Sequence, residues 1–219
     1  MRIVIAGGHG QIALRLATLL AARGDEVVGL VRNPAHVDDV GRAGATAVVV
    51  DLEKADAASL AEHLEAADAV VFAAGAGPGS GVARKDTVDR AAASLLADAA
   101  ARAGVRRYLL VSAIGIDDEP DAARGDQWVA YVHAKKAAED AVRATDLDWT
   151  FLRPGRLTDD AGVGTVLLGP PGLEYGEITR DDTAAVLVAL LDTPASAGLV
   201  LDAVGGDTPV AEAVEAAVR

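Results

Sequence analysis

The sequence predicts an α/β fold in which helices cover both faces of a doubly wound parallel sheet. Short β-branched segments of strand length alternate with helix-length segments along the chain. A glycine-rich turn at residues 7–10 joins the first strand to the first helix. The composition is 51% hydrophobic but only 3% aromatic, so the core consists of Ala, Val and Leu, as in helix-covered parallel sheets.

The expected elements follow one another in the order that such a sheet requires. Apolar runs predict strands at residues 2–6, 26–31, 46–50, 68–72, 107–111, 148–152 and 198–204. We expect the third strand to be as buried as its neighbours. Helices are expected after residue 10 and at residues 34–44, 57–64, 86–103, 131–144, 179–191 and 210–218.

Turn-forming residues support these boundaries. Pro34 stands at a first helical position, Gly104 stops a helix and Pro154 ends a strand. The acidic segment 117–121 and the chain up to Trp128 are expected to be irregular and solvated, with Trp128 as a wall of a pocket. Residues 162–176 are rich in Gly and Pro and predict the lip of that pocket.

Cysteine usage and the first residues indicate a compartment. The chain has no Cys, which excludes disulfides and Cys-ligated metal, and its 4 His are scattered, which argues against a His-based metal site. Met1 precedes the first strand directly, without the basic and apolar regions of a signal peptide. We therefore expect a cytoplasmic protein without a metal site.

The net charge of −13 and the pI near 4.6 argue against nucleic acid as a partner, because phosphates require a basic surface. No apolar run reaches the roughly 20 residues that span a bilayer, so we expect no membrane insertion. The expected partner is a small molecule, and the expected state is a monomer or a homodimer. An anionic ligand then needs local backbone N–H groups and a few well-placed cations.

The glycine turn predicts a dinucleotide site. Gly7 allows a tight reversal, the missing side chains of Gly8 and Gly10 let a pyrophosphate approach the backbone, and Ala13 lets the helix pack close to the strand. The first amides of the helix lack intrahelical partners and lie at its positive end, so they stabilise an anion. The alternative is a tight turn in an α/β domain that binds nothing.

The end of the second strand bears on the choice between NADP and NAD. An acid at this position accepts from the ribose 2′-OH and selects NAD, whereas an Arg pairs with the 2′-phosphate of NADP. Arg32 stands there, so NADP(H) is favoured and NAD(H) remains an alternative. Otherwise Arg32 is a solvated cation that stacks near the adenine.

Two further strand ends contribute expected contacts. Asp51, followed by Leu52, either accepts from the adenine amino group or caps or turns the chain into the helix at residues 57–64. The loop that begins with Ala73, Ala74 and Gly75 and continues through the glycines to residue 81 is expected to pass under the cofactor ribose.

Ser112, Tyr131 and Lys135 predict a reducing site. Positions i and i+4 share a helix face, so the Lys135 ammonium can stabilise the phenolate form of Tyr131. Tyr131 then protonates a carbonyl oxygen that Ser112 also contacts, while Lys135 holds the nicotinamide ribose. The alternative is a packed aromatic and a solvated helix cation.

These segments resemble the atypical short-chain dehydrogenase/reductase family, and within it the small NAD(P)-binding, NmrA-like and flavin-reductase-like members often labelled NAD-dependent epimerase/dehydratase. The motifs that carry the resemblance are Gly7-Gly8-His9-Gly10-Gln11-Ile12-Ala13, Val31-Arg32-Asn33-Pro34, Asp51-Leu52, Ala73-Ala74-Gly75, Val111-Ser112-Ala113, Tyr131 with Lys135, residues 149–155 and residues 180–184. The resemblance implies a Rossmann fold with strand order 3-2-1-4-5-6, to which the last strand adds a candidate seventh.

The resemblance also implies roles for individual residues. The implied cofactor-binding residues are Gly7, Gly8, His9, Gly10, Gln11, Ile12, Arg32, Asp51, Leu52, Ala73, Ala74, Gly75, Ser112, Lys135, Pro154 and Gly155. The implied catalytic residues are Ser112, Tyr131 and Lys135. Two features depart from the family: no Asn stands near Ser94, where typical members carry one, and the segment after Pro154 is short for enclosing a nucleotide-sugar.

Three functions are compatible with this pattern. The favoured one is an NADPH-dependent reductase of a small carbonyl, quinone or flavin-like acceptor, formed by a single domain of residues 1–219 in which residues 156–219 contribute a small substrate-side region. The second is an NADP-binding redox sensor without turnover, a behaviour ascribed to NmrA-like proteins. The third is a nucleotide-sugar epimerase or dehydratase, which Arg32 and the short tail disfavour.

Overall fold

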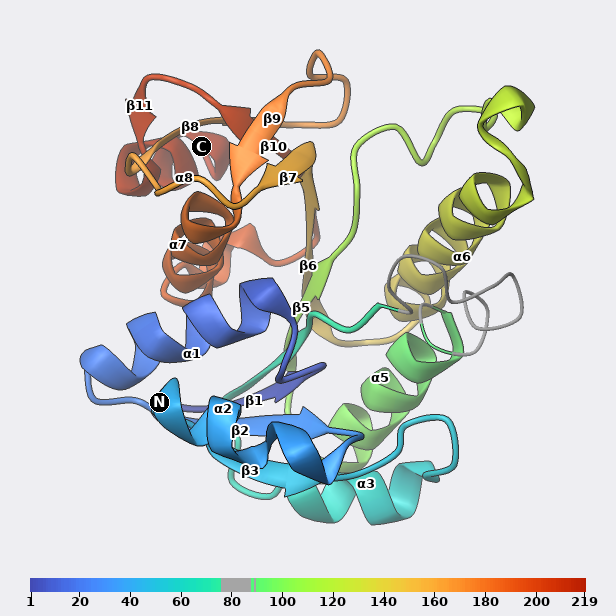
Figure 1. The fold of residues 1–219 in the computed structure, drawn as a ribbon, viewed down its shortest axis with the longest axis vertical. Helices are drawn as coiled ribbons and strands as arrows, with labels where there is room; N and C mark the ends of the chain where they lie inside the picture. Colours follow the sequence, from blue (N-terminus) through green and yellow to red (C-terminus); the bar gives the residue numbers. More distant parts are fainter. Residues whose placement is uncertain (76–87, 89) are drawn as a thin grey trace.

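The structure is a computed structural model that describes residues 1–75, 88 and 90–219. Its main sheet runs in the spatial order β11-β8-β10-β6-β5-β4-β1-β2-β3 (Figure 1). The strands of this sheet are β1 (Arg2–Ala6), β2 (Glu26–Val31), β3 (Thr46–Val49), β4 (Ala69–Phe72), β5 (Arg107–Val111), β6 (Asp148–Pro154), β8 (Thr165–Gly169), β10 (Leu199–Gly205) and β11 (Thr208–Pro209). The predicted order 3-2-1-4-5-6 is confirmed, and β10 pairs in parallel with β6 as the seventh strand.

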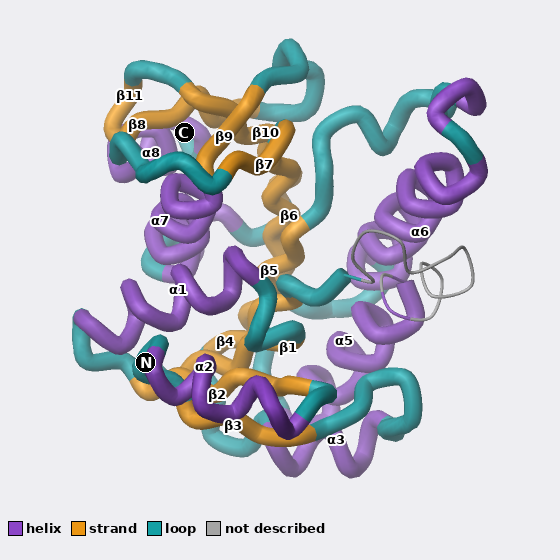
Figure 2. The backbone as a smooth tube through the Cα atoms, viewed as in Figure 1, coloured by secondary structure: helices purple, strands orange, loops and turns teal. Residues whose placement is uncertain are grey.

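Helices cover both faces of the sheet (Figures 1 and 2). One face carries α1 (Gln11–Ala22), α2 (Val37–Arg42), α7 (Arg180–Leu191) and α8 (Val210–Ala217); the other carries α3 (Ala57–His63), α5 (Ala92–Ala103) and α6 (Asp126–Arg143). Alternate side chains of β1 enter the two cores: Ile3 and Ile5 pack toward α1, and Val4 and Ala6 pack toward α5. This pattern explains why the strands read as continuous apolar runs.

The C-terminal third contains short elements that the composition did not indicate. β8 pairs antiparallel with β10, β11 pairs antiparallel with β8 at the edge of the main sheet, and β7 (Arg156–Thr158) pairs with β9 (Glu177–Thr179) in a separate parallel sheet. The predicted lip at residues 162–176 therefore contains a strand. Thr179 caps α7 by accepting from the Asp182 amide.

Several boundaries differ from those predicted. The predicted helix at residues 34–44 is a 3₁₀ turn, η1 (Pro34–His36), followed by the short helix α2. α6 begins at Asp126, so Trp128 lies in the first turn of α6 rather than in a loop. Gly125, at φ 89°, makes the turn into α6, and a second 3₁₀ turn, η3 (Ala122–Arg124), precedes it. Residues 86, 87 and 89 of the predicted helix 86–103 lie outside the described residues, as do residues 76–81 of the glycine-rich loop.

The prediction that β3 is buried was wrong. It is an edge strand of the sheet, and Val49 is 49% exposed. An edge strand has a neighbour on one side only, so an apolar run by itself does not show full burial.

The carboxyl ends of the central strands lie together and position the site. The Ala73 amide after β4 donates to the Ala6 carbonyl at 3.0 Å, and the Ser112 amide after β5 donates to Leu152 at 2.7 Å. The Gly155 amide after β6 donates to Ala203 at 2.9 Å. The strand order reverses between β1 and β4, which is where ligands bind in doubly wound sheets.

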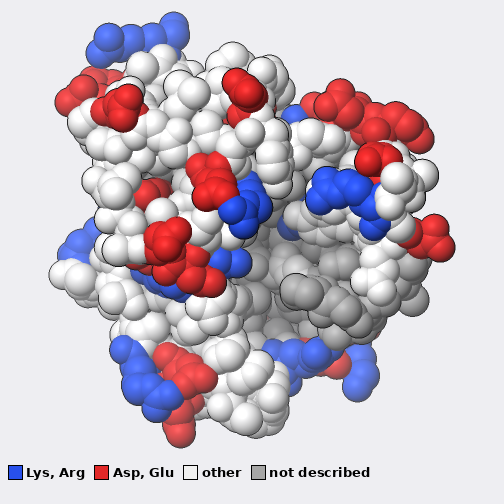
Figure 3. All heavy atoms as spheres, turned by 45° about the horizontal axis from the view of Figure 1, so that its top comes forward, with Lys and Arg blue, Asp and Glu red and all other residues white. Residues whose placement is uncertain are grey.

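Charges of both signs are interspersed on the face shown in Figure 3, where acidic groups lie next to basic ones around a hollow. None of the helices in the described part of the chain combines the length and the apolar character needed to cross a bilayer.

Candidate cofactor and active site

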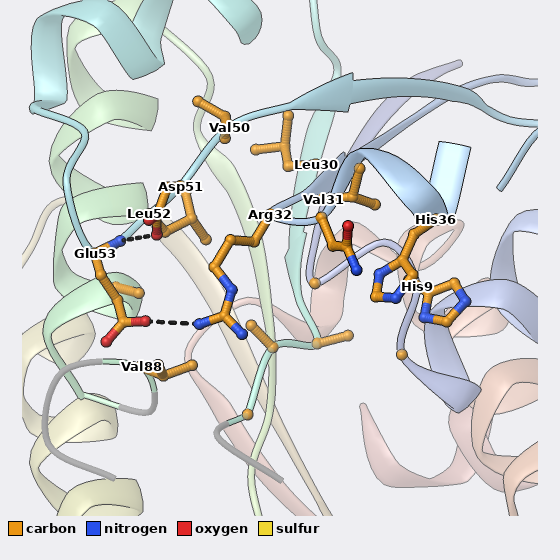
Figure 4. Close-up of a pocket in the computed structure, with 17 residues that line it drawn as sticks. His9, Leu30, Val31, Arg32, His36, Val50, Asp51, Leu52, Glu53 and Val88 are labelled. Atoms are coloured by element: carbon orange, nitrogen blue, oxygen red, sulfur yellow. Dashed lines mark hydrogen bonds and ion pairs between the residues drawn. The ribbon is translucent and has the colours of Figure 1, made fainter. Parts of the chain in front are cut away.

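A cavity of about 330 Å³ opens at the carboxyl ends of β1, β2, β3 and β4 (Figure 4). Predicted cofactor-binding residues that line it are Gly7, His9, Gly10, Arg32, Asp51, Leu52, Ala73, Ala74 and Gly75. The cavity volume lies at the lower end of the range for small-molecule and cofactor sites. These residues come from four segments far apart in the sequence, which thus meet where the glycine turn predicts a ligand.

The glycine turn packs against both neighbouring strands. Gly7 has φ 82°, and a Cβ on it would lie 2.5 Å from Ala74 Cα. A Cβ on Gly8 would lie 2.6 Å from Gly29 Cα, in the middle of β2. The missing side chain of Gly8 therefore makes room for β2, whereas we predicted that it makes room for a phosphate. Any substituent here would separate the strands that form the cavity.

The N-terminus of α1 is open to a ligand. Gly10 is its N-cap, and no side chain among the described residues caps it. The Gln11 side chain instead accepts from Arg15 at 2.8 Å, and Ile12 packs in the core with 9% exposure. Neither residue lines the cavity with its side chain, so their predicted contribution is through backbone amides at the positive end of the helix dipole.

Arg32 lies at the end of β2 and forms an ion pair that we did not predict. Its Nη1 donates to Glu53 Oε2 at 3.0 Å (Figure 4). The Arg32 side chain is 53% exposed and the Glu53 side chain 25%. Glu53 follows β3 and lines the same cavity, so an acid faces the predicted 2′-phosphate site from a neighbouring strand.

Asp51 turns the chain and does not cap the following helix. Its Oδ1 accepts from the Glu53 amide at 3.1 Å, and its Oδ2 lies 3.4 Å from Lys54 Nζ. Asp56 caps α3 instead, accepting from Ala58 and Ser59 at 2.9 Å. Of the predicted alternatives for Asp51, the turn fits the structure and the N-cap was wrong. Its place in the cavity wall keeps the predicted adenine contact open.

Two histidines stack at the other end of the cavity. The rings of His9 and His36 lie 3.6 Å apart with 12° between their planes (Figure 4). His9 Nε2 lies 2.8 Å from Asp39 Oδ2, and this hydrogen bond, with the nearby Arg42 charge, holds the pKa of Asp39 below its usual value. No pattern in the sequence indicates His36, which reaches the cavity because η1 turns back toward the glycine loop.

The residues of the predicted reducing group lie on two elements: Ser112 follows β5, and Tyr131 and Lys135 are on α6. Ser112 is 3% exposed, and its Oγ has no hydrogen-bond partner among the described residues. Lys135 is 5% exposed and donates through Nζ to the Val111 carbonyl at 2.8 Å. The alternative interpretation of Lys135 as a solvated cation was therefore wrong. Tyr131 is half-buried one turn earlier on α6, with its ring 5.6 Å from that of Trp128.

A buried ion pair anchors α6 to β6. Arg153 donates through Nε and Nη2 to the two carboxylate oxygens of Glu139, at 2.8 and 2.6 Å. The Arg153 side chain is 3% exposed and that of Glu139 is fully buried. Asp117 accepts from Arg153 at 2.5 Å and from Lys136 at 2.6 Å, and these bonds lower its pKa to about 2. Glu139 is one turn after Lys135, so this pair fixes the part of α6 that carries the predicted catalytic residues.

Pro154 and Gly155 connect this cluster to the C-terminal third. The Pro154 carbonyl accepts from Ile114 at 3.2 Å, and the Arg156 amide donates to Gly176 at 2.8 Å. Neither residue lines the cavity over β1 to β4. They lie at the end of β6, which pairs with β5, the strand that Ser112 follows.

The residues present fit a dinucleotide better than a metal. The described residues contain no group of three or more His, Cys, Asp or Glu that could hold a metal ion. They do contain an uncapped helix N-terminus next to glycines, a cation at the end of β2 and a buried hydroxyl without a partner. These features suit a phosphate-containing ligand whose other end reaches Ser112.

Comparisons with known proteins agree with this geometry. Residues 7–194 match a family described as NAD(P)H-binding. The chain is 34% identical over 216 residues to the protein described as "Uncharacterized sugar epimerase YhfK" of Bacillus subtilis, with 98% of this chain and 99% of that protein covered.

Two solved structures have the same fold at appreciable identity. The structure described as "Putative NAD-dependent epimerase/dehydratase from Bacillus halodurans" superposes with a TM-score of 0.90 at 33% identity, covering 99% of each chain. The oxidoreductase ylbE from Lactococcus lactis superposes with a TM-score of 0.87 at 27% identity, covering 99% of this chain and 96% of that chain. The resemblance to atypical short-chain dehydrogenases/reductases is thereby confirmed, and the chain belongs to the NAD(P)H-binding family.

Proposed function

We propose that the protein is an NADPH-dependent reductase of a small carbonyl, quinone or flavin-like acceptor. The observation that carries this proposal is the cluster at the end of β5, where the buried Ser112 hydroxyl lacks a partner among the described residues. The preceding residue, Val111, accepts from the buried Lys135 ammonium at 2.8 Å. A buried hydroxyl without a partner costs about 1–3 kcal/mol, so a site that retains one has a use for it.

The chain's own residues then have distinct roles in reducing a carbonyl. NADPH, when bound, supplies the hydride. Tyr131 donates its phenolic proton to the carbonyl oxygen, which becomes the hydroxyl of the product, and Ser112 donates a hydrogen bond to the same oxygen. Lys135 provides positive charge that stabilises the phenolate left on Tyr131 and, in the proposed complex, contacts the nicotinamide ribose. Burial of Lys135 strengthens this electrostatic effect, because little water screens it.

The proposed cofactor is NADP(H), held in the cavity over β1 to β4. The open N-terminus of α1 and the glycine turn support binding of the pyrophosphate. Arg32 supports binding of the 2′-phosphate, and the lining residues Asp51 and Leu52 support the adenine side. In this proposal residues 156–219 form the substrate side of a single domain.

The experiment that tests the reaction is oxidation of NADPH, followed at its nicotinamide absorbance, with a panel of carbonyls, quinones and free flavins. We expect Tyr131→Phe to lower the rate with the best carbonyl at least about 100-fold, the usual contribution of a positioned proton donor. Lys135→Met is expected to lose most activity. Its matched control, Lys136→Met, is expected to retain it, because Lys136 faces Asp117 at the surface.

Two outcomes would contradict the reductase proposal. Nucleotide binding without turnover on the whole panel would favour the redox sensor. Purification with tightly held NAD, together with interconversion of nucleotide-sugars, would favour the epimerase. The epimerase stays in the assay for two reasons: the Bacillus subtilis relative is described as a sugar epimerase, and an acid, Glu53, pairs with Arg32.

A further inference from the structure

We propose that Glu53 sets the cofactor preference by competing with the 2′-phosphate for Arg32, so that the site accepts both NADP(H) and NAD(H). The inference rests on the proposed function, in which a dinucleotide occupies the cavity over β1 to β4. Arg32 reaches this cavity from the end of β2, and Glu53 reaches it from the loop after β3. The 3.0 Å ion pair between them spans the position where the residue at the end of β2 selects the cofactor (Figure 4).

Glu53 is the better fixed of the two partners. Its amide donates to Asp51 Oδ1 at 3.1 Å, which holds the Glu53 backbone in a turn. Its side chain is 25% exposed, whereas that of Arg32 is 53% exposed. A partly exposed ion pair opens at little cost, so Arg32 is able to turn toward a ligand while the Glu53 carboxylate remains in the cavity wall.

NADP(H) and NAD(H) interact differently with the Arg32–Glu53 ion pair. A 2′-phosphate carries a charge of about −1.5 to −2 at pH 7, so it gains from Arg32 but lies near the Glu53 carboxylate. A ribose 2′-OH is neutral and donates to a carboxylate, as it does in sites that select NAD. Glu53 therefore penalises NADP(H) and supports NAD(H), while Arg32 does the reverse.

The other acid that lines the cavity does not duplicate this effect. Asp51 directs one oxygen at the Glu53 amide and has its second oxygen 3.4 Å from Lys54 Nζ. Its charge is thus balanced within its own turn. Glu53 is the carboxylate that lies directly against Arg32.

The test is calorimetric titration of the full chain with NADPH and with NADH, at one ionic strength, for wild type and Glu53→Gln. The matched control is Glu26→Gln, because Glu26 also forms a 3.0 Å ion pair with an arginine, Arg2, at the opposite end of β2 and outside the cavity. We expect Glu53→Gln to raise the ratio of NADPH to NADH affinity about tenfold, which corresponds to about 1.4 kcal/mol. Glu26→Gln is expected to leave the ratio unchanged.

A double variant makes the result specific. If Glu53 competes for Arg32, that part of its effect is lost in the Arg32→Ala background, so Glu53→Gln changes the ratio there by less than in wild type. An unchanged ratio in Glu53→Gln overturns the inference and leaves the proposed function intact. Failure of wild type to bind either nucleotide overturns the proposed function itself. If thermal unfolding shows that Glu53→Gln is not folded, Glu53→Asp replaces it in the test. Its shorter side chain moves the carboxylate away from Arg32, so we expect the ratio of NADPH to NADH affinity to rise here too.

Discussion

Glu139→Ala is expected to destabilise the protein by about 3–5 kcal/mol, the cost of leaving a buried ion without its partner. Among the described residues, Arg153 would keep Asp117 as its one ion-pair partner; the Asp117 side chain is 47% exposed, whereas the Arg153 side chain is 3% exposed. Both hydrogen bonds to the Glu139 carboxylate, at 2.8 and 2.6 Å, would be lost. For a chain of this size the corresponding fall in melting temperature is about 6–20 °C.

The assay is urea unfolding followed by circular dichroism, with Arg143→Ala as the control. Arg143 pairs with the same carboxylate at 3.4 Å but is 37% exposed, so its loss is expected to cost about 1 kcal/mol or less. A loss below about 1 kcal/mol for Glu139→Ala would refute the conclusion that this pair anchors α6. Replacement of both partners by Leu and Met is expected to be far milder than Glu139→Ala, because no buried charge is left unpaired.

Two further predictions concern pH and the glycine turn. The pKa of Asp117 is about 2 in the folded protein, against an ordinary value of 3.8. The ionised carboxylate therefore stabilises the fold fully above about pH 4, and this stabilisation is lost as the pH falls through 2. We expect Asp117→Asn to be less stable at pH 7 and to show a flatter decline of the free energy of unfolding between pH 4 and pH 2. Gly8→Ala would place a Cβ 2.6 Å from Gly29 Cα, so we expect it to destabilise the protein by about 1–3 kcal/mol and to weaken nucleotide binding. The control is Gly41→Ala, because a Cβ on this helical glycine would have no atom within 4 Å. Thermal unfolding is expected to show that Gly41→Ala leaves the stability of the protein unchanged or raises it.

Much of the central fold could be predicted because local signals agreed with the tertiary arrangement. β1, β2 and β5 match their predicted ranges, since each is a β-branched or apolar run bounded by turn residues. The start of α6 was missed because its first turn, at Asp126 to Trp128, carries polar and bulky residues that are also typical of loops. β7 and β9, of three residues each, are too short to show a period.

The cavity was predicted in part for a similar reason. The glycine turn and Arg32 belong to one contiguous strand–turn–helix–strand segment, so their positions in the cavity follow from the local sequence pattern. Glu53 and His36 enter the site only because β3 and η1 fold back beside β2, and nothing in their own neighbourhood signals this. The burial of Lys135 likewise follows from the packing of α6 on β5 and could not be inferred from its spacing to Tyr131.

The most direct test of the account is titration of wild type and Arg32→Ala with NADPH and NADH, followed by calorimetry or by nucleotide fluorescence. We expect wild type to bind NADPH more tightly than NADH, and Arg32→Ala to weaken NADPH binding about tenfold while changing NADH binding little. That result would place the 2′-phosphate at the end of β2 and support the cavity as the cofactor site. Binding of neither nucleotide, or an equal loss of both in Arg32→Ala, would contradict it.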